Sequence, residues 1–513
     1  MVKSNIEEKE LIPYTKVMTG DDYQHRNMLY QLRLSIRKAK RIDMVVAFLK
    51  QSGLKLIIND LRYALENGAQ INILTGVYLG ITEPQALYYL KNEFEDQIQI
   101  KIYHHSNKSF HPKAYFFHYE NYSELLIGSS NLTYSALTNG IEWNYRFTNE
   151  HDKQSFDEFY EIYLDLFDNH STLLDDKVLK DYSSKWKKNH LLKEIEKYEI
   201  KQDDQGFEPR GAQIEALYAL KQTRKEGAKK ALVQAATGIG KTYLAAFDSQ
   251  KYQKVLFVAH QEEILKQAAN SFYNVRKSLD YGFFDGNNKT NDKSVIFASV
   301  ATLGKEEYLN DQYFSKDYFD YIIIDEFHHA ASKNYQNIVN YFKPKFLLGL
   351  TATPERMDGK NIYAICDYNA PYELTLKDAI NKGMLVPFHY YGIYDEVDYS
   401  NIKYVKGKYD EEQLTDIYIN NQKRFELIYK HYLKHPSKQA LGFCCSKKHA
   451  LEMTKYFIKK GIKAVAVYSN AKEEYTMQRD YAIELLKKEE IQIIFSVDMF
   501  NEGVDITSAD PCL

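Results

Sequence analysis

A series of short apolar runs, each followed at once by polar or glycine-rich residues, constrains the fold of this 513-residue chain most strongly. The runs lie between residues 231 and 353 and are ALVQAAT, KVLFVAH, SVIFASV, YIIIDE and KFLLGLTAT. Strands that are apolar along their whole length are buried on both faces, as in parallel sheets covered by helices. Ligands of such sheets bind outside the carboxyl ends of the strands, where these polar residues fall. A second series, ALGFCCS, KAVAVYS and IQIIFSV, begins after residue 387 and predicts a second parallel-sheet lobe.

The region from residue 23 to about residue 149 has a different pattern. Helical periodicity over residues 28–39 and 54–66 alternates with the short β-rich runs IDMVVAFL, INILTG, IQIKIYH, AYFFHY and ELLIGSS. This alternation predicts a separate α/β layer domain. A highly charged stretch from Lys185 predicts a connector. We therefore expect an N-terminal extension (1–22), an α/β domain (23–175), a helical linker (176–205), one complete parallel-sheet lobe (206–385) and one incomplete lobe (386–513).

Charge and hydropathy narrow the classes of protein to be considered. The formal net charge is only −3, so any nucleic-acid contact must come from local patches and not from an overall basic field. The first residues lack an apolar stretch of signal-peptide length, and no run of about 18 apolar residues follows that would span a bilayer. The sequence predicts a soluble, cytoplasmic protein without a membrane partner.

The first apolar run leads into AATGIGKT, which has the spacing of a phosphate-binding loop between a strand and a helix. Gly238 and Gly240 let the backbone curl, so that its N–H groups and the positive end of the next helix cradle phosphate oxygens. Lys241 supplies a positive charge for the outer phosphates, and Thr242 supplies a hydroxyl ligand for Mg²⁺. The alternative is a glycine-bearing turn with an accidental lysine. The residues expected to contact the nucleotide here are Thr237, Gly238, Ile239, Gly240, Lys241 and Thr242.

Two adjacent acids follow the run YIII. Asp325 can hold Mg²⁺ together with Thr242, and Glu326 can orient and deprotonate the attacking water. Adjacent acids after a strand are common as plain surface charge, but the phosphate-binding loop upstream favours the catalytic interpretation.

In their order and spacing these motifs resemble those of superfamily 2 helicases and translocases. The resemblance implies ATP as the cofactor, with Mg²⁺, and DNA as a partner held mainly by its backbone. It assigns adenine recognition to Gln213 and contact with the nucleic-acid backbone to Thr302. It assigns the coupling of ATP hydrolysis to movement of the nucleic-acid strand to residues 351–353. It also assigns a nucleotide contact from the second lobe to Asp505. The family continues with QxxGRxxR, which is not found before Leu513, so we expect a C-terminally truncated motor or a fragment.

The N-terminal region carries HPKAYFFH, beginning at His111, and GSSN, beginning at Gly128. His111 and Lys113 alternate on an expected strand, which would point both side chains the same way. A histidine can attack phosphorus to form a covalent intermediate, while lysine, serine and asparagine stabilise the charge on the non-bridging oxygens. That scheme needs no metal. A lone HxK is more often a structural histidine beside a surface lysine, but GSSN at this distance favours function.

These residues resemble the nuclease branch of the phospholipase-D superfamily, which implies catalytic roles for His111, Lys113, Ser129 and Asn131. The family motif has an aspartate where this chain has His118, so one expected acid is missing. Glu142 resembles a glutamate of some restriction nucleases in this superfamily and could fix the tautomer of His111. The family site combines two motifs and this chain has one, so we expect a homodimer through the N-terminal domain.

Together the two halves resemble ATP-dependent type IV, modification-dependent restriction endonucleases, and residues 372–388 resemble the segment that joins the lobes of such motors. The expected function is an ATP-dependent DNA helicase or translocase coupled to a phospholipase-D-type endonuclease. Two alternatives remain open. One is a helicase or remodeller whose N-terminal domain only binds phosphate, and the other is a DNA-binding remnant without ATPase activity.

Overall fold

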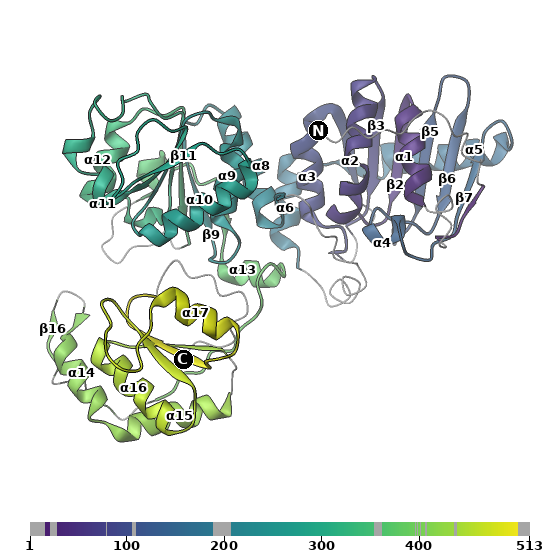
Figure 1. The fold of residues 1–513 in the computed structure, drawn as a ribbon. Coiled ribbons are helices and arrows are strands. Elements are labelled where there is room, and N and C mark those ends of the chain that lie inside the picture. The colour runs from purple at the N-terminus through teal and green to yellow at the C-terminus, as the bar shows by residue number, and fades with distance from the viewer. Residues whose placement is uncertain are drawn as a thin grey trace. The chain divides into compact units, whose positions relative to one another are not determined.

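The computed structural model describes residues 16–20, 28–77, 80–104, 109–187, 207–352, 362–394, 397, 399–400, 402–405, 408–435 and 439–500. They fall into two compact units, Met1–Pro387 and Phe388–Leu513 (Figure 1). The first unit contains two sheets and the second contains the remaining strands.

The N-terminal domain is built on a mixed sheet. Among its described residues eight strands follow the order β1-β7-β6-β5-β2-β3-β4-β8. The strands β2, β3 and β4 are parallel, and β5, β6, β7 and β1 extend the sheet in antiparallel pairs. Their bounds are β1 (Val17–Met18), β2 (Arg41–Val46), β3 (Gln70–Thr75), β4 (Ile98–Tyr103), β5 (Lys113–His118), β6 (Ser123–Gly128), β7 (Asn144–Thr148) and β8 (Ser171–Leu173).

Helices cover both faces of this sheet. Residues of α1, α2 and α3 share a core with one face, and Phe156, Tyr163 and Phe167 of α5 share a core with the other. Asp152 begins α5 by accepting a hydrogen bond from the backbone N–H of Ser155, as helix N-caps do. The helices are α1 (Met28–Lys38), α2 (Gln51–Glu66), α3 (Pro84–Phe94), η2 (Glu95–Gln97), α4 (Tyr134–Leu137), α5 (Lys153–Asn169) and α6 (Asp176–Lys185).

The second sheet of the first unit is wholly parallel, as the apolar runs predicted. Within its described residues seven strands follow the order β11-β12-β10-β13-β14-β9-β15. The five runs form five of these strands, and the core residues of each are buried. The strands are β9 (Lys230–Ala235), β10 (Val255–Ala259), β11 (Tyr281–Phe284), β12 (Val295–Ser299), β13 (Tyr321–Ile324), β14 (Phe346–Thr351) and β15 (Tyr372–Leu374).

Helices again form a layer on each face of the sheet. Residues of α8, α9, α10 and α13 share one core with it, and residues of α11 and α12 share the other. The helices are α8 (Ala212–Lys225), α9 (Lys241–Asp248), η3 (Ser249–Lys251), α10 (Glu262–Arg276), α11 (Val300–Leu303), η4 (Glu306–Tyr308), η5 (Phe327–His329), α12 (Lys333–Tyr341), η6 (Tyr363–Cys366) and α13 (Leu376–Asn381).

The second unit contains the second parallel sheet that the sequence predicted. Among its described residues the order is β18-β20-β19, with α15 and α16 packed on one face and α17 on the other. The elements are β16 (Tyr404–Val405), β17 (Lys408–Tyr409), α14 (Glu411–Ile419), α15 (Gln422–Lys434), β18 (Ala440–Phe443), α16 (Lys447–Lys459), β19 (Ala464–Val467), α17 (Arg479–Lys487) and β20 (Ile493–Ser496). None of the helices in the described part of the chain is both long and apolar enough to cross a bilayer.

Candidate active sites

The first candidate site lies at one edge of the N-terminal sheet. Val46 at the end of β2 pairs with Lys113 at the start of β5, and Gly128 at the end of β6 pairs with Asn144 at the start of β7. Both predicted motifs therefore meet at this edge. The expectation that His111 lies on the strand was wrong, because β5 begins at Lys113. Pro112 separates the two residues and has no N–H with which to join a strand pair.

His111 and Lys113 nevertheless contact each other. Lys113 Nζ lies 2.5 Å from His111 Nδ1 and donates to the carbonyl oxygen of His111 at 2.8 Å. An ammonium can only donate, so the ring nitrogen accepts and His111 is neutral in this arrangement. Partial burial and the charge of Lys113 lower the pKa of His111 below 6.5. Burial also lowers the pKa of Lys113, against the opposing charge of Glu142. The site thus presents an exposed imidazole with a lowered pKa beside a buried lysine.

The GSSN loop is held against the segment that precedes β7. Ser129 Oγ donates to the carboxylate of Glu142 and accepts a 2.9 Å hydrogen bond from the backbone N–H of Trp143. Gly128 makes this close approach possible, since a Cβ there would lie 2.1 Å from the carbonyl oxygen of Trp143. Among the described residues Glu142 makes no hydrogen bond with His111, so it contacts the loop serine and not the histidine it was expected to orient.

The two remaining residues of the loop differ in their surroundings. Ser130 is fully buried, donates to the carbonyl of Ala136 and accepts from the amide of Asn144. Asn131 Oδ1 accepts a 3.0 Å hydrogen bond from the backbone N–H of Phe48, whose ring packs edge-on against His111. Ser130 therefore anchors the loop, while Asn131 is linked to His111 through Phe48. Phe48 had no recognisable motif in the sequence.

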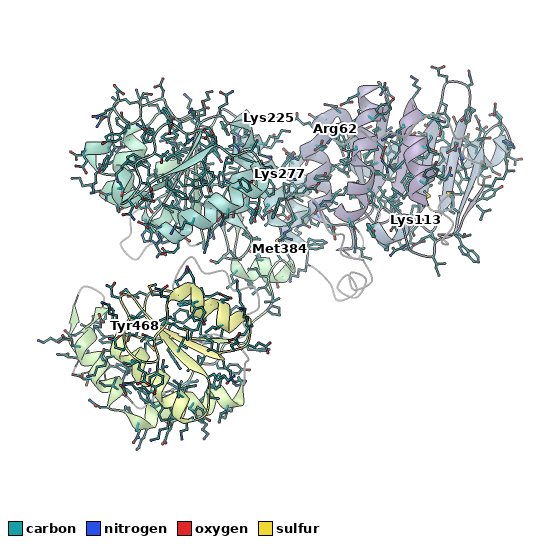
Figure 2. The ribbon with its side chains drawn as sticks, viewed as in Figure 1. Arg62, Lys113, Lys225, Lys277, Met384 and Tyr468 are labelled. Carbon is teal, nitrogen blue, oxygen red and sulfur yellow. The ribbon has the colours of Figure 1, made fainter. Side chains whose placement is uncertain are left out.

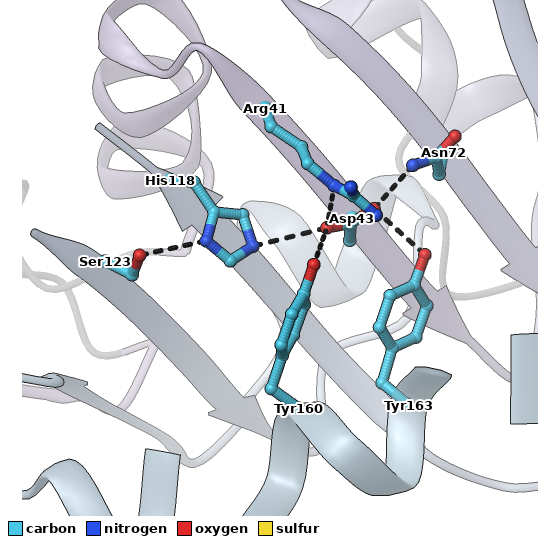
Figure 3. A network of polar contacts seen from close by, with 7 residues as sticks. All are labelled: Arg41, Asp43, Asn72, His118, Ser123, Tyr160 and Tyr163. Atoms are coloured by element: carbon cyan, nitrogen blue, oxygen red, sulfur yellow. Dashed lines mark hydrogen bonds and ion pairs between the residues drawn. The ribbon is translucent and has the colours of Figure 1, made fainter. Parts of the chain in front are cut away.

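His118, which replaces the family aspartate, lies at the other end of β5 from Lys113. Figure 3 shows it in a polar network with Asp43 and Ser123. Its Nε2 is 3.3 Å from Asp43, and its Nδ1 is 2.9 Å from Ser123 Oγ. Asp43 also accepts from Arg41 at 2.9 Å. The further donors to this carboxylate are Asn72, Tyr160 and Tyr163.

Asp43 is completely buried beneath α5. Burial alone would raise its pKa, but the contacts with His118, Arg41 and Asn72 outweigh burial and lower it. A carboxylate thus does lie against position 118, contributed by the neighbouring strand β2. The polar network joins strands to α5 and lies away from the catalytic edge. The only sequence signal for it was a charged residue inside the apolar run IDMVVAFL.

The second candidate site lies at the carboxyl edge of the parallel sheet. The phosphate-binding loop follows β9, and α9 begins at Lys241. Gly238 and Gly240 have φ values of 90° and 82°, which favour glycine. Gln213 Nε2 donates to the carbonyl oxygens of Ile239 and Gly240 at 3.3 and 3.2 Å. The residue assigned to adenine recognition therefore contacts the loop directly.

Lys241 lies close enough to Asp325 and Glu326 to interact with their charges. Its Nζ donates to the carbonyl oxygen of Ala235 at 3.1 Å. Burial lowers its pKa, while the charges of Glu326 and Asp325 act in the opposite direction. The opposing carboxylates favour the charged ammonium, which is the form that binds phosphate.

Asp325 and Glu326 follow β13 on the same edge of the sheet. Glu326 has a φ of 47°, and such left-handed backbone in a non-glycine residue is concentrated at functional sites. Its carboxylate lies 3.3 Å from His328 Nδ1, which is also 3.3 Å from Thr351 Oγ1 at the end of β14. Burial would raise the pKa of Glu326, but His328 and Lys241 hold it lower, so the carboxylate is available as a base.

His328 was not among the predicted site residues, although it stands in the DEFHH string. It connects the predicted base to the threonine assigned to coupling. Thr302 lies on α11 and is buried. Thr353 and Asp505 lie outside the described residues. The hydroxyl of Thr242 and the carboxylate of Asp325 are the hard oxygen ligands that Mg²⁺ prefers.

Comparison with known proteins matches three parts of the chain to three families. Residues 32–168 match "Cardiolipin synthase, PLD-like domain", residues 206–356 match "Type III restriction enzyme, res subunit", and residues 423–512 match "Helicase conserved C-terminal domain". Each candidate site falls inside its own match. The chain therefore joins a phospholipase-D-like domain to the two parallel-sheet lobes of a superfamily 2 helicase.

Individual relatives agree with this class. IRC3 of Saccharomyces cerevisiae, named for ATP-dependent helicase activity, is 26% identical over 59% of this chain and 46% of its own length. A "51.5 kDa protein" of a Lactococcus phage is 26% identical over 54% of this chain and 56% of its own. The type I restriction enzyme EcoAI endonuclease subunit of Escherichia coli is 26% identical over 50% of this chain and 35% of its own. The chain thus spans about half the length of each of the first two relatives and 35% of the third.

Among solved structures, the type ISP restriction-modification enzyme LlaBIII bound to DNA has a TM-score of 0.43 and 16% identity, covering 60% of this chain and 25% of that one. The two helicase family matches imply ATP binding.

Proposed function

We propose that the chain is an ATP-dependent DNA helicase or translocase coupled to a phospholipase-D-type endonuclease that acts in restriction of foreign or modified DNA. The observation that carries the nuclease part is the exposed His111, with its lowered pKa, in contact with the buried Lys113 at the sheet edge where β6 leads into the GSSN loop. The relationship to restriction-enzyme subunits supports restriction as the setting.

The proposed cleavage proceeds in two balanced steps. A nitrogen of His111 forms a bond to phosphorus as the bond from phosphorus to the leaving sugar oxygen breaks, and an acid protonates that oxygen. Lys113 stabilises the negative charge that develops on the non-bridging oxygens. Water then attacks phosphorus and gives a proton to the group that acted as the acid in the first step, while the bond to His111 breaks and the imidazole is regenerated. The nuclease site needs no metal in this scheme.

A second copy of the chain is the proposed source of the acid, because this site offers one HPK motif. The segment before β7 supplies a surface for it. Glu142 turns inward to Ser129, whereas its neighbours Ile141 and Trp143 are 86% and 75% exposed. Tyr145 and Val17, paired across β7 and β1, continue this apolar face beside the catalytic edge. We assign the face to a homodimer, which would bring two copies of His111 together.

In the motor part, ATP would occupy the loop before α9, with Mg²⁺ on Thr242 and Asp325. Glu326 is the proposed base for the attacking water, and Asp505 is proposed to complete the site. Duplex DNA is proposed to be held mainly through its phosphates.

A second candidate function is a helicase or remodeller with an inactive N-terminal domain. The departure at His118 favours it, because the family acid is absent from that position. The buried position of the Asp43 network, away from the catalytic edge, makes this departure compatible with an active site.

Plasmid cleavage by three versions of the protein tests the proposal. With Mg²⁺ and ATP present, the wild type should cleave, His111→Ala should not, and Lys241→Ala should lose the response to ATP while binding DNA as before. Equal cleavage by the wild type and His111→Ala would exclude His111 as the nucleophile. Cleavage by neither protein, together with ATP-dependent unwinding by both, would establish the second candidate.

A further inference from the structure

Helix α8 belongs to two hydrophobic cores at once. Ala212, Ala216 and Leu220 pack into the core of the parallel sheet. Ile214 and Tyr218, on another side of the same helix, pack into the core of the nuclease domain. Figure 1 shows α8 beside α3 and α6 of that domain. The helix that carries Gln213 is therefore shared between the nucleotide lobe and the nuclease domain.

A buried polar cluster fixes the first turn of α8. Glu215, 3% exposed, accepts a 2.6 Å hydrogen bond from Gln85 on α3 of the nuclease domain. It also accepts from Lys382 at 3.0 Å and from the hydroxyl of Tyr372 at 3.1 Å. Lys382 in turn donates to Ser183 on α6 at 2.9 Å. A buried, fully hydrogen-bonded carboxylate is costly to displace, so the cluster holds the helix in one orientation.

The rest of α8 is tied to the same domain. Lys221 donates to the carbonyl oxygen of Asn92 at 3.1 Å, and Lys225 lies 2.7 Å from Glu95. Tyr218 donates to Asp176 at the start of α6. Figure 2 marks Lys225 on this helix. Contacts with the nuclease domain thus run along the helix from its first turn to its last.

Gln213 and Glu215 are two positions apart, or about 3 Å along the helix axis. A rigid helix transmits any rotation at Glu215 to Gln213. The tolerance at Gln213 is small, because its Nε2 lies 2.5 Å from where a Cβ on Gly240 would be. The position of the glutamine amide on the loop therefore depends on where the nuclease domain holds α8.

We propose that the nuclease domain, through Gln85 and Glu215, positions Gln213 and so sets the preference of the motor for adenine over other bases. This inference rests on the proposed role of Gln213 in adenine recognition. Gln85 acts through Glu215 and is a positioning residue, not a catalytic one. The nuclease domain then contributes to nucleotide selectivity in addition to cutting DNA.

The test is the ratio of the dissociation constants for GTP and ATP, measured on the full chain by competition against a fluorescent ATP analogue. Gln85→Met keeps the side-chain volume and removes the donor to Glu215. We expect it to reduce the ratio roughly three- to tenfold, the effect of losing one buried hydrogen bond. Glu215→Gln, which removes the charge opposite Lys382, should reduce it as well. General loss of stability would weaken ATP and GTP binding alike and leave the ratio unchanged.

Gln31→Met is the matched control. Gln31 is a buried glutamine of the same domain that accepts from Arg146 at 3.2 Å, away from α8. The ratio of the GTP and ATP dissociation constants should therefore be the same for Gln31→Met as for the wild type. Gln213→Ala separates the two proposals. If Gln213→Ala lowers the ratio but Gln85→Met and Glu215→Gln do not, the proposed positioning of Gln213 by the N-terminal domain is wrong, while the role of Gln213 in adenine recognition stands. If Gln213→Ala leaves the ratio unchanged, adenine recognition by Gln213 and the inference built on it both fail.

Discussion

Partial burial and the charge of Lys113, two positions further along the chain, lower the pKa of His111. The ammonium of Lys113 contacts the imidazole ring of His111. A neutral imidazole has one nitrogen with an electron pair, which here accepts from Lys113 and could attack phosphorus only once that ammonium turns to the phosphate, whereas an imidazolium has no such pair. In the proposed mechanism this pair of residues provides the nucleophile and the charge that stabilises the transition state.

Removing the charge of Lys113 should raise the pKa of His111 toward its ordinary value of 6.5. The sign follows from repulsion, since a nearby positive charge disfavours the imidazolium and its loss favours it. NMR titration of protein carrying isotope-labelled histidine, in the wild type and in Lys113→Met, measures this shift independently of cleavage. An unchanged or lower pKa in Lys113→Met would show that Lys113 does not control the protonation of His111.

At this scale the sequence identified residues that belong to contiguous motifs. HPK, GSSN and the phosphate-binding loop could be predicted because each carries its chemistry within a few positions. Phe48 and His328 could not, since their contacts with His111 and Thr351 come from other parts of the sheet. The hydrogen bond of Glu142 to Ser129 likewise depends on the pairing of β6 with β7.

At the scale of elements, Asp43 joins β2, β3, β5 and α5 through one carboxylate. Its partners come from each of these elements, and none of them is close to it in sequence except Arg41. Because the carboxylate is fully buried, every donor would lose its acceptor together if the charge were removed. The network therefore holds α5 on the sheet.

Asp43→Asn should destabilise the nuclease domain by about 2–3 kcal/mol, because it leaves buried donors without a charged acceptor. The folded-state pKa of Asp43 is below 3.8, so its contribution is fully present above pH 3.8 and is lost as the pH falls through the lowered value. Urea unfolding of both proteins as a function of pH measures this difference. If the difference in unfolding free energy between the two proteins stays the same at the lowest pH, it arises from the shape of the side chain and not from its charge.

The sequence predicted elements well where burial is complete. The eight apolar runs of the two lobes all became parallel strands, since a strand buried on both faces has few alternatives. The prediction placed the start of β5 too early, because it did not account for the effect of Pro112 on strand pairing. The sequence did not predict that α8 packs into two cores. In the sequence its two apolar sides look like one broad amphipathic face, and only the structure divides them between the cores.

At the scale of the whole molecule, the N-terminal domain has two surfaces that bear on its proposed roles. It packs against the nucleotide lobe through α8, and it presents an exposed apolar face beside its catalytic edge. The first contact is internal to the chain. The second is assigned to another copy, which would complete the nuclease site.

Trp143→Asp should weaken the homodimer at least about tenfold, since an exposed tryptophan at the centre of an apolar face is a typical interface anchor. Sedimentation velocity measures the dissociation constant, and cleavage should fall together with dimer content. Phe159→Asp is the control, because Phe159 is 41% exposed on α5 of the same domain and lies outside this face. Full cleavage by a monomeric wild-type protein would contradict a shared active site.

The most direct measurement for the central claim is cleavage of plasmid DNA by the purified chain in excess EDTA, with denaturing electrophoresis to detect protein joined to DNA. We expect nicked and linear plasmid without any divalent metal, a covalent adduct in the wild type, and neither in His111→Ala. Cleavage that needs Mg²⁺, gives no adduct and proceeds equally in His111→Ala would contradict the claim.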